Sequence, residues 1–207
     1  MIHEGQPVAR RGPSLEDARA VGVLLHGRGR DPEDVLALAD RIGDPGVAWF
    51  APAARDGSWY PQSFLAPLAD NEPYLSSAIG VVEALLHTLG DPARVVLGGF
   101  SQGACLAAEY ALRHPHRYGG LLLYTGGFIG PPTTVPPRMG AFEGTPAYLG
   151  TSDPDDWVPA ERVRETAAAL ERLGAAVTLD VFAGLGHVVN DEEIEAGRAL
   201  LSSALPP

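Results

Sequence analysis

Residues 98–104 have the sequence Gly98-Gly99-Phe100-Ser101-Gln102-Gly103-Ala104, which contains the pattern G-x-S-x-G. The apolar run before it, at 94–97, is typical of a buried strand, and residues 104–113 form a good helix sequence. Ser101 therefore lies on a strand-to-helix turn, where side chains at Gly99 and Gly103 would collide with the neighbouring strand and helix. Such a turn presents a nucleophilic serine at the positive end of the helix. A Gly-rich nucleotide-binding connection or a plain tight turn is the alternative.

The composition limits the classes of protein to which the chain can belong. Its 207 residues, 45% of them hydrophobic, suit a single domain over 1–207. A net charge of −11 argues against nucleic acid as a partner and against docking on anionic membranes. The single cysteine, Cys105, excludes an internal disulfide, and we expect it to be a small buried residue. Since neither a signal peptide nor a membrane span is visible, we expect a cytoplasmic protein without stable membrane insertion. A homodimer is compatible with the sequence.

Strands and helices are expected to alternate along the chain after a short irregular lead-in over 1–18. The strands are expected at 20–25, 47–50, 94–97, 120–124, 147–150 and 177–182. The helices are expected near 32–42, 74–89, 104–113, 160–173 and 191–204. This alternation predicts an α/β fold with a mostly parallel sheet and helices on both faces.

In such sheets the functional groups gather beyond the carboxyl ends of the strands. His187 follows the last expected strand and is the best candidate for the base that a serine nucleophile needs. A carboxylate that orients the histidine is expected from the loop after the preceding strand, where Asp153, Asp155 and Asp156 are the candidates. The order serine, aspartate, histidine agrees with the α/β-hydrolase arrangement.

Two backbone N–H groups are needed to stabilise the oxyanion that forms when a serine attacks a carbonyl. One is expected from Gln102, the residue after Ser101. The other is expected from Arg28, in the glycine-rich turn His26-Gly27-Arg28-Gly29. For the guanidinium of Arg28 we expect a surface salt bridge, and contact with a substrate oxygen is the alternative.

Two connections rich in glycine and proline, 51–73 and 126–145, also leave the carboxyl ends of strands. The first contains Trp59 and Phe64, and the second contains Phe128 and Ile129. We expect these four side chains to line an apolar acyl-binding cleft over the serine, because loops at strand ends commonly carry binding residues. Packing of the loops against the core is the alternative.

Over most of its length the sequence resembles the phospholipase/carboxylesterase family of α/β-hydrolases, which includes acyl-protein thioesterases. Residues 26–29 are similar to the family's H-G-x-G loop, residues 98–103 to its G-G-F-S-Q-G elbow, and Gly186-His187 to its final G-H. Residues 153–159 are similar to its D-x-D-P-x-V-P segment. The triad that this resemblance implies is Ser101, Asp155 and His187.

The acidic segment departs from the family's pattern in two ways. Asp156 replaces the usual proline, and residues 151–152 lengthen the approach to the first aspartate. Counted back from 158–159, Asp155 holds the family's position, whereas counted forward from the strand end Asp153 has the usual spacing. We favour Asp155, because a helix start is a firmer anchor than a lengthened loop. Asp153 is the alternative acid, and otherwise we expect it to cap the loop through backbone N–H groups.

These features predict a serine carboxylesterase that acts on small-molecule esters, such as lysophospholipids or short-to-medium acyl esters, through an acyl-enzyme. A thioesterase acting on acyl-proteins or acyl-CoA is the alternative within the same class of enzyme. A non-catalytic ligand-binding module on the same fold is the other alternative, against which the intact Ser, His, Asp set argues. Neither a metal nor another cofactor is implied, since no cluster of side chains has ligand spacing.

Overall fold

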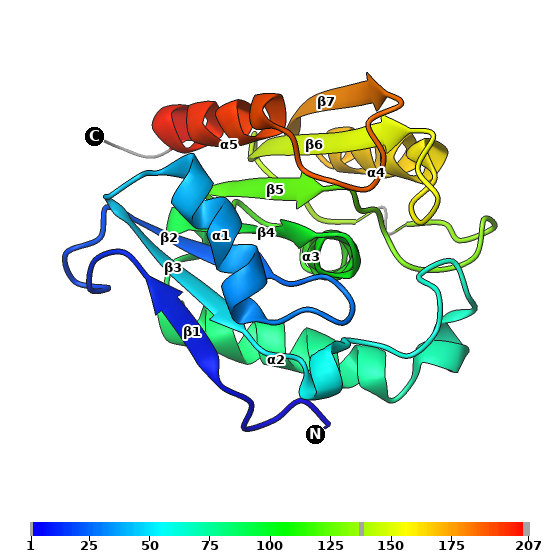
Figure 1. Ribbon diagram of the computed structural model, residues 1–207, viewed down its shortest axis with the longest axis horizontal. Helices are drawn as coiled ribbons and strands as arrows, with labels where there is room; N and C mark the ends of the chain where they lie inside the picture. Colours follow the sequence, from blue (N-terminus) through cyan, green and yellow to red (C-terminus); the bar gives the residue numbers. More distant parts are fainter. Residues whose placement is uncertain (1, 137–138, 205–207) are drawn as a thin grey trace.

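The computed structural model describes residues 2–136 and 139–204, and its centre is one sheet of seven strands (Figure 1). The strand order is β1-β3-β2-β4-β5-β6-β7, and every pairing is parallel except that of β1 with β3. The strands are β1 (Val8–Arg11), β2 (Ala20–Leu25), β3 (Val47–Pro52), β4 (Val95–Phe100), β5 (Gly120–Tyr124), β6 (Pro146–Asp153) and β7 (Ala176–Ala183).

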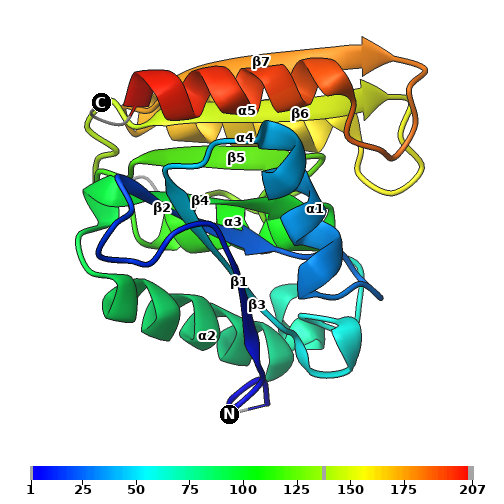
Figure 2. The ribbon, with the colours of Figure 1, turned by 60° about the vertical axis from the view of Figure 1, so that its left-hand side comes forward.

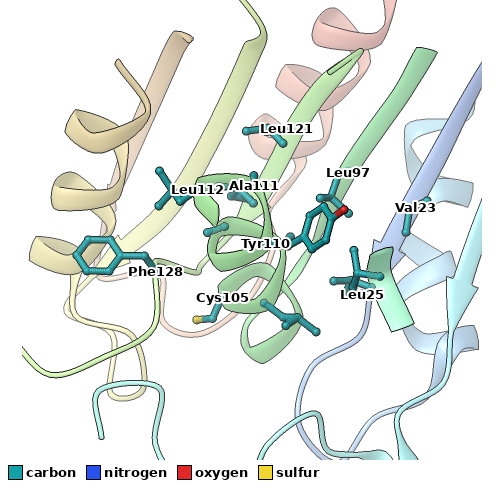
Figure 3. Close-up of a cluster of buried hydrophobic side chains, with 14 of the residues drawn as sticks. Val23, Leu25, Leu97, Cys105, Tyr110, Ala111, Leu112, Leu121 and Phe128 are labelled. Carbon is teal, nitrogen blue, oxygen red and sulfur yellow. The ribbon is translucent and has the colours of Figure 1, made fainter. Parts of the chain in front are cut away.

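Helices cover both faces of the sheet, as the alternation of elements predicted (Figures 1 and 2). They are α1 (Pro32–Ile42), α2 (Tyr74–Leu89), α3 (Gln102–Arg113), α4 (Ala160–Arg172) and α5 (Asp191–Ala204). Leu36 of α1 and Leu201 of α5 belong to the core on one face. Val82 of α2, Leu106 of α3 and Leu170 of α4 belong to the larger core on the other face, part of which Figure 3 shows around α3.

Local signals explain why the central elements form where they were predicted. All residues of β2 and β5 are buried, as expected for strands of a parallel sheet that is covered on both faces. The side chain of Asp31 accepts from the amide of Asp34, and the side chain of Asp34 accepts from the amide of Asp31. These two bonds form a capping box that starts α1. Gly43 ends that helix in the left-handed conformation.

The expected irregular lead-in over 1–18 is wrong, because residues 8–11 form the edge strand β1. It pairs antiparallel with β3, from Val8 opposite Pro52 to Arg11 opposite Trp49. Its four residues alternate between exposed and half-buried, which is a pattern too short and too polar to distinguish it from a loop in the sequence. The same pairing extends β3 beyond its predicted end at Phe50.

Within the described ranges, the structure contains no helix with the length and apolar character needed to cross a bilayer.

Candidate active site

Ser101 occupies the sharp turn between β4 and α3. Its φ of 55° and ψ of −120° are a conformation that L-residues rarely adopt and that is found at strained functional turns. Its amide donates to the carbonyl of Tyr124 (3.0 Å), which ties the turn to the neighbouring strand. A Cβ atom at Gly103 would lie 1.9 Å from the carbonyl oxygen of Leu25, and one at Gly99 would lie 2.4 Å from it. The predicted collision at both glycines is therefore confirmed.

A chain of hydrogen bonds runs from Ser101 through His187 to Asp155. Nε2 of His187 lies 2.8 Å from Oγ of Ser101, and Nδ1 lies 2.8 Å from Oδ2 of Asp155. The Asp155 side chain is fully buried, while that of His187 is 21% exposed. With the proton on Nδ1 directed at the carboxylate, Nε2 can accept the hydroxyl proton of Ser101. The buried carboxylate can then stabilise the imidazolium that forms.

The other oxygen of Asp155 fixes the loop that carries it. Oδ1 accepts from the amides of Trp157 and Val158, both at 2.8 Å. This is the capping contact that was expected of Asp153, so that expectation is wrong. The reason is that β6 continues through Asp153, whose exposed carboxylate lies 3.6 Å from Arg164. The structure thus brings Asp155 to the histidine and leaves Asp153 on the surface.

Gln102 and Arg28 lie just after the ends of β4 and β2, which are neighbouring strands of the sheet. Gln102 is the first residue of α3, so its amide has no acceptor within the helix. The backbone hydrogen bonds of the described residues give the amide of Arg28 no acceptor either. Both amides are therefore available to a substrate oxygen.

The guanidinium of Arg28 forms no surface salt bridge within the described ranges, so this expectation is wrong. It donates instead to the carbonyls of Pro61 (2.9 Å) and Gln62 (2.6 Å) and to the hydroxyl of Ser58 (3.2 Å). The guanidinium also lies over the ring of Tyr60, with its carbon 5.7 Å from the ring centroid. These contacts hold the loop after β3 against the turn after β2.

A cavity of about 630 Å³ opens at Ser101. Its wall includes Phe64, which the sequence predicted, and also Tyr60, Phe100 and Trp157, which it did not. Trp157 is 71% exposed and lies in the acidic loop beside Asp155, a position from which its role in the wall could have been inferred. The cavity therefore places the hydrogen-bonded serine beside aromatic side chains, and polar residues such as Arg30 and Gln62 line it as well.

Three of the four predicted cleft residues do not line this cavity, and for them the core-packing alternative is correct. Trp59 is fully buried, and its indole N–H donates to the carbonyl of His26 (2.9 Å). Phe128 belongs to the core, part of which Figure 3 shows. The guanidinium carbon of Arg162 lies 4.3 Å from the centroid of its ring. Ile129 is also fully buried. These loops fold inward because their large apolar side chains gain more from burial than from exposure at a rim.

Two buried histidines support the turns around the site. Nε2 of His26 accepts from the amide of Ala54 (3.0 Å), in agreement with the structural role that its glycine turn indicated. His3 lies between the carbonyl of Trp59 and the amide of Arg55, at 3.0 Å from each. Burial lowers the pKa of both imidazoles, so both are neutral at neutral pH.

Glu193 is a buried carboxyl group that sequence reasoning missed. Its Oε2 accepts from the amide of Asn190 (2.8 Å), and Oδ1 of Asn190 accepts from the amide of Glu193 (2.9 Å). This capping box starts α5. Its first residue, Asn190, lies three residues after His187, so the box fixes the loop that carries the histidine. The other oxygen, Oε1, is buried without a partner in the described chain, and burial raises the pKa of Glu193 to about 7. The spacing N-x-x-E before the helix was the available signal.

Cys105 is fully buried in α3, as predicted, and burial raises the pKa of its thiol to about 12. Among residues 2–136 and 139–204, no group of three or more His, Cys, Asp or Glu side chains is arranged to hold a metal ion.

Comparison with known proteins gives matches to esterases and thioesterases. The acyl-protein thioesterase 1 of Gibberella zeae is 34% identical over 119 residues, which make up 56% of this chain and 50% of that protein. The chain spans about half the length of the curated relatives it matches. A solved phospholipase/carboxylesterase from Dyadobacter fermentans superposes with a TM-score of 0.90 at 33% identity, covering 99% of this chain and 98% of that one. Esterase PE8 gives a TM-score of 0.77 at 27% identity, covering 97% and 98%.

The family described as Phospholipase/Carboxylesterase has a sequence model that matches residues 13–204. Since this match includes every strand after β1 and every helix, the chain belongs to the phospholipase/carboxylesterase family of α/β-hydrolases.

Proposed function

We propose that this protein is a serine carboxylesterase with Ser101, His187 and Asp155 as its catalytic triad. The observation that carries the proposal is the hydrogen-bond chain through these three residues, with 2.8 Å at both links, at a cavity partly lined by aromatic side chains. The substrates are small-molecule esters whose acyl chain lies along these aromatic side chains. Membership of a family that contains esterases supports the same reaction class.

In the proposed mechanism, Oγ of Ser101 attacks the ester carbonyl while Nε2 of His187 takes the hydroxyl proton. The negative charge that forms on the carbonyl oxygen is held by the amides of Arg28 and Gln102. Asp155 stabilises the imidazolium without itself becoming protonated. His187 then gives the proton to the leaving alcohol, and water attacks the acyl-enzyme with the same histidine as base.

Hydrolysis of thioesters is the second candidate function, and the relatives named acyl-protein thioesterase 1 favour it. The same triad can attack either carbonyl, so the two functions differ in substrate and not in machinery. A purely ligand-binding role requires neither the strained turn at Ser101 nor the buried carboxylate of Asp155.

A fluorophosphonate probe tests the mechanism, because it labels only an activated serine. We expect stoichiometric labelling of Ser101 in the wild-type protein and none in Ser101→Ala, which removes one oxygen and leaves the fold intact. Rates on matched p-nitrophenyl esters and acyl thioesters then separate the two candidate functions. Wild-type protein that is not labelled and hydrolyses neither the esters nor the thioesters would refute the proposal.

A further inference from the structure

The two amides proposed to hold the oxyanion come from turns that no sheet hydrogen bond connects directly. Pairing between β2 and β4 ends at Leu25 opposite Gly99, three residues before Arg28 and Gln102 respectively. A misplacement of about 1 Å in a catalytic group can cost about 10²-fold in rate. Some contact beyond the sheet therefore has to fix the two turns relative to each other.

The segment 58–62, from the loop after β3, contacts both turns. On the β4 side it meets the side chain of Gln102, whose Oε1 accepts from the amide of Trp59 (3.0 Å). The amide nitrogen of the same side chain donates to the carbonyl of Tyr60 (2.8 Å). On the β2 side, the indole N–H of Trp59 donates to the carbonyl of His26 (2.9 Å). One residue, Trp59, therefore bonds directly to both turns.

Other contacts hold the same segment against the β2 turn. The guanidinium of Arg28 donates to three oxygens between Ser58 and Gln62. Just before the segment, the carbonyl of Gly57 accepts from the amide of Gly29 (2.8 Å). Thus each residue proposed to supply an oxyanion amide also uses its side chain to hold the segment 58–62.

Trp59 is held firmly in place, so it can fix the turn at 26–29 relative to Gln102. It is fully buried, its ring centroid lies 5.0 Å from that of His26, and its carbonyl is 3.0 Å from Nε2 of His3. A buried indole N–H needs an acceptor, and the acceptor here is a carbonyl of the β2 turn. Loss of that bond would leave the His26 carbonyl without this donor and would remove the direct link from Trp59 to the turn, so the turn could shift within the limits set by its other bonds.

We propose that Trp59 is a positioning residue of the oxyanion hole, which sets the turn at 26–29 in register with Gln102. The inference rests on the proposed function, because the hole matters only if an oxyanion forms. Trp59 does not line the cavity, so it acts through the two turns and not on the substrate.

The exchange Trp59→Phe tests this, because it removes the N–H and keeps a buried aromatic ring. We expect kcat on a p-nitrophenyl ester to fall by about 10- to 100-fold, with KM near the wild-type value. This fall is no larger than the fall in kcat that removal of one oxyanion donor causes, because the donor is displaced and not removed. Active sites are counted by exhaustive fluorophosphonate labelling, so unfolded protein does not enter the rate. The inhibition constant of an alkyl trifluoromethyl ketone, which forms a tetrahedral oxyanion on serine, should rise by the factor by which kcat/KM falls.

Trp49→Phe is the matched control, since Trp49 is a buried tryptophan in the core on the other face of the sheet. It should lower stability and leave kcat per active site near wild type. If Trp59→Phe does not fold, Gln102→Ala provides the second test. It keeps the backbone amide of residue 102 and removes every side-chain hydrogen bond from this residue to Ser58, Trp59 and Tyr60. It should give the same loss of kcat.

An unchanged kcat and inhibition constant in folded Trp59→Phe, or in Gln102→Ala where that variant replaces it, would overturn the inference. An equal loss of kcat in Trp49→Phe would also overturn it, because the effect would then be a general cost of the exchange. In both cases an active wild-type enzyme leaves the proposed function standing. A wild-type protein that hydrolyses no ester would overturn both together.

Discussion

Asp155 and His187 lie in the loops that follow the paired strands β6 and β7, and Oδ2 of the aspartate meets Nδ1 of the histidine at 2.8 Å. The pairing runs as far as Asp153 opposite Ala183, so both loops leave the same edge of the sheet. Because Oδ1 of Asp155 is bound by two amides of its own loop, the carboxylate cannot rotate without losing hydrogen bonds. Its orientation toward the histidine is therefore set before any substrate arrives.

This geometry predicts the outcome of a pair of Asp→Asn exchanges. Asp155→Asn keeps the shape but removes the charge and favours the wrong tautomer of His187, so kcat should fall by up to about 10⁴-fold. Asp153→Asn makes the same exchange on an exposed carboxylate whose ion pair with Arg164 contributes about 0–1 kcal/mol, so kcat should stay near wild type. Both are measured as kcat on one p-nitrophenyl ester. The reverse pattern would transfer the role to Asp153.

The wall of the cavity predicts a change in acyl selectivity. Phe64→Ala removes an aromatic ring from the cavity at Ser101, so the ratio of kcat/KM for decanoate over acetate esters should fall. Tyr74→Ala is the control, because Tyr74 is a partly exposed aromatic residue on α2 outside the cavity wall. A folded Phe64→Ala variant with the wild-type ratio would exclude Phe64 from the acyl-binding site.

The regular elements were predictable because each carries a local signal. The buried run of β2 and the capping box of α1 decide their structure within a few residues of sequence. The edge strand β1 carries no such signal, since it exists only through its pairing with β3, some forty residues away. Pairing with β7 likewise extends β6 to Asp153, an extension that the apolar pattern does not mark.

The order and spacing of motifs predicted which strand ends would meet, but not which way loop side chains would point. A strand alternates its side chains between two faces, whereas the connection after β3, residues 53–73, has no such period. Trp59 can be buried because its indole N–H finds an acceptor in the His26 carbonyl. Phe64, five residues later, faces the cavity. Only the contacts made in the folded protein distinguish the position of Trp59 from that of Phe64.

Burial of Cys105 predicts an unreactive thiol. Because burial raises its pKa to about 12, the thiolate that alkylating agents attack is scarce at pH 8 and also out of contact with solvent. Native protein treated with iodoacetamide at pH 8 should remain unmodified by mass spectrometry, and the same protein in denaturant should be fully alkylated. Alkylation of the native protein at the denatured rate would contradict the burial of this side chain.

Glu193 predicts a specific pH dependence of stability. Its pKa is about 7 in the folded protein and about 4.3 in an unfolded chain, so between these values the folded state holds a proton that the unfolded state has lost. This contribution stabilises the fold at low pH and is lost as the pH rises through about 7. Glu193→Gln keeps an acceptor for the amide of Asn190 and does not titrate. Its free energy of unfolding relative to wild type should therefore increase between pH 5 and pH 8, as measured by urea denaturation at each pH.

The difference between variant and wild type isolates this group from other buried groups that titrate. His3 and His26 have lowered pKa values, so the unfolded chain binds protons that they do not, and their contribution is lost as the pH falls below about 6.5. That slope opposes the slope of Glu193, but it is the same in both proteins and cancels. Glu192→Gln, an exposed neighbour on the same turn, should give a difference independent of pH. Parallel wild-type and Glu193→Gln profiles would mean that Glu193 is ionised in the folded protein, and its buried oxygen would then need a partner such as an ordered water.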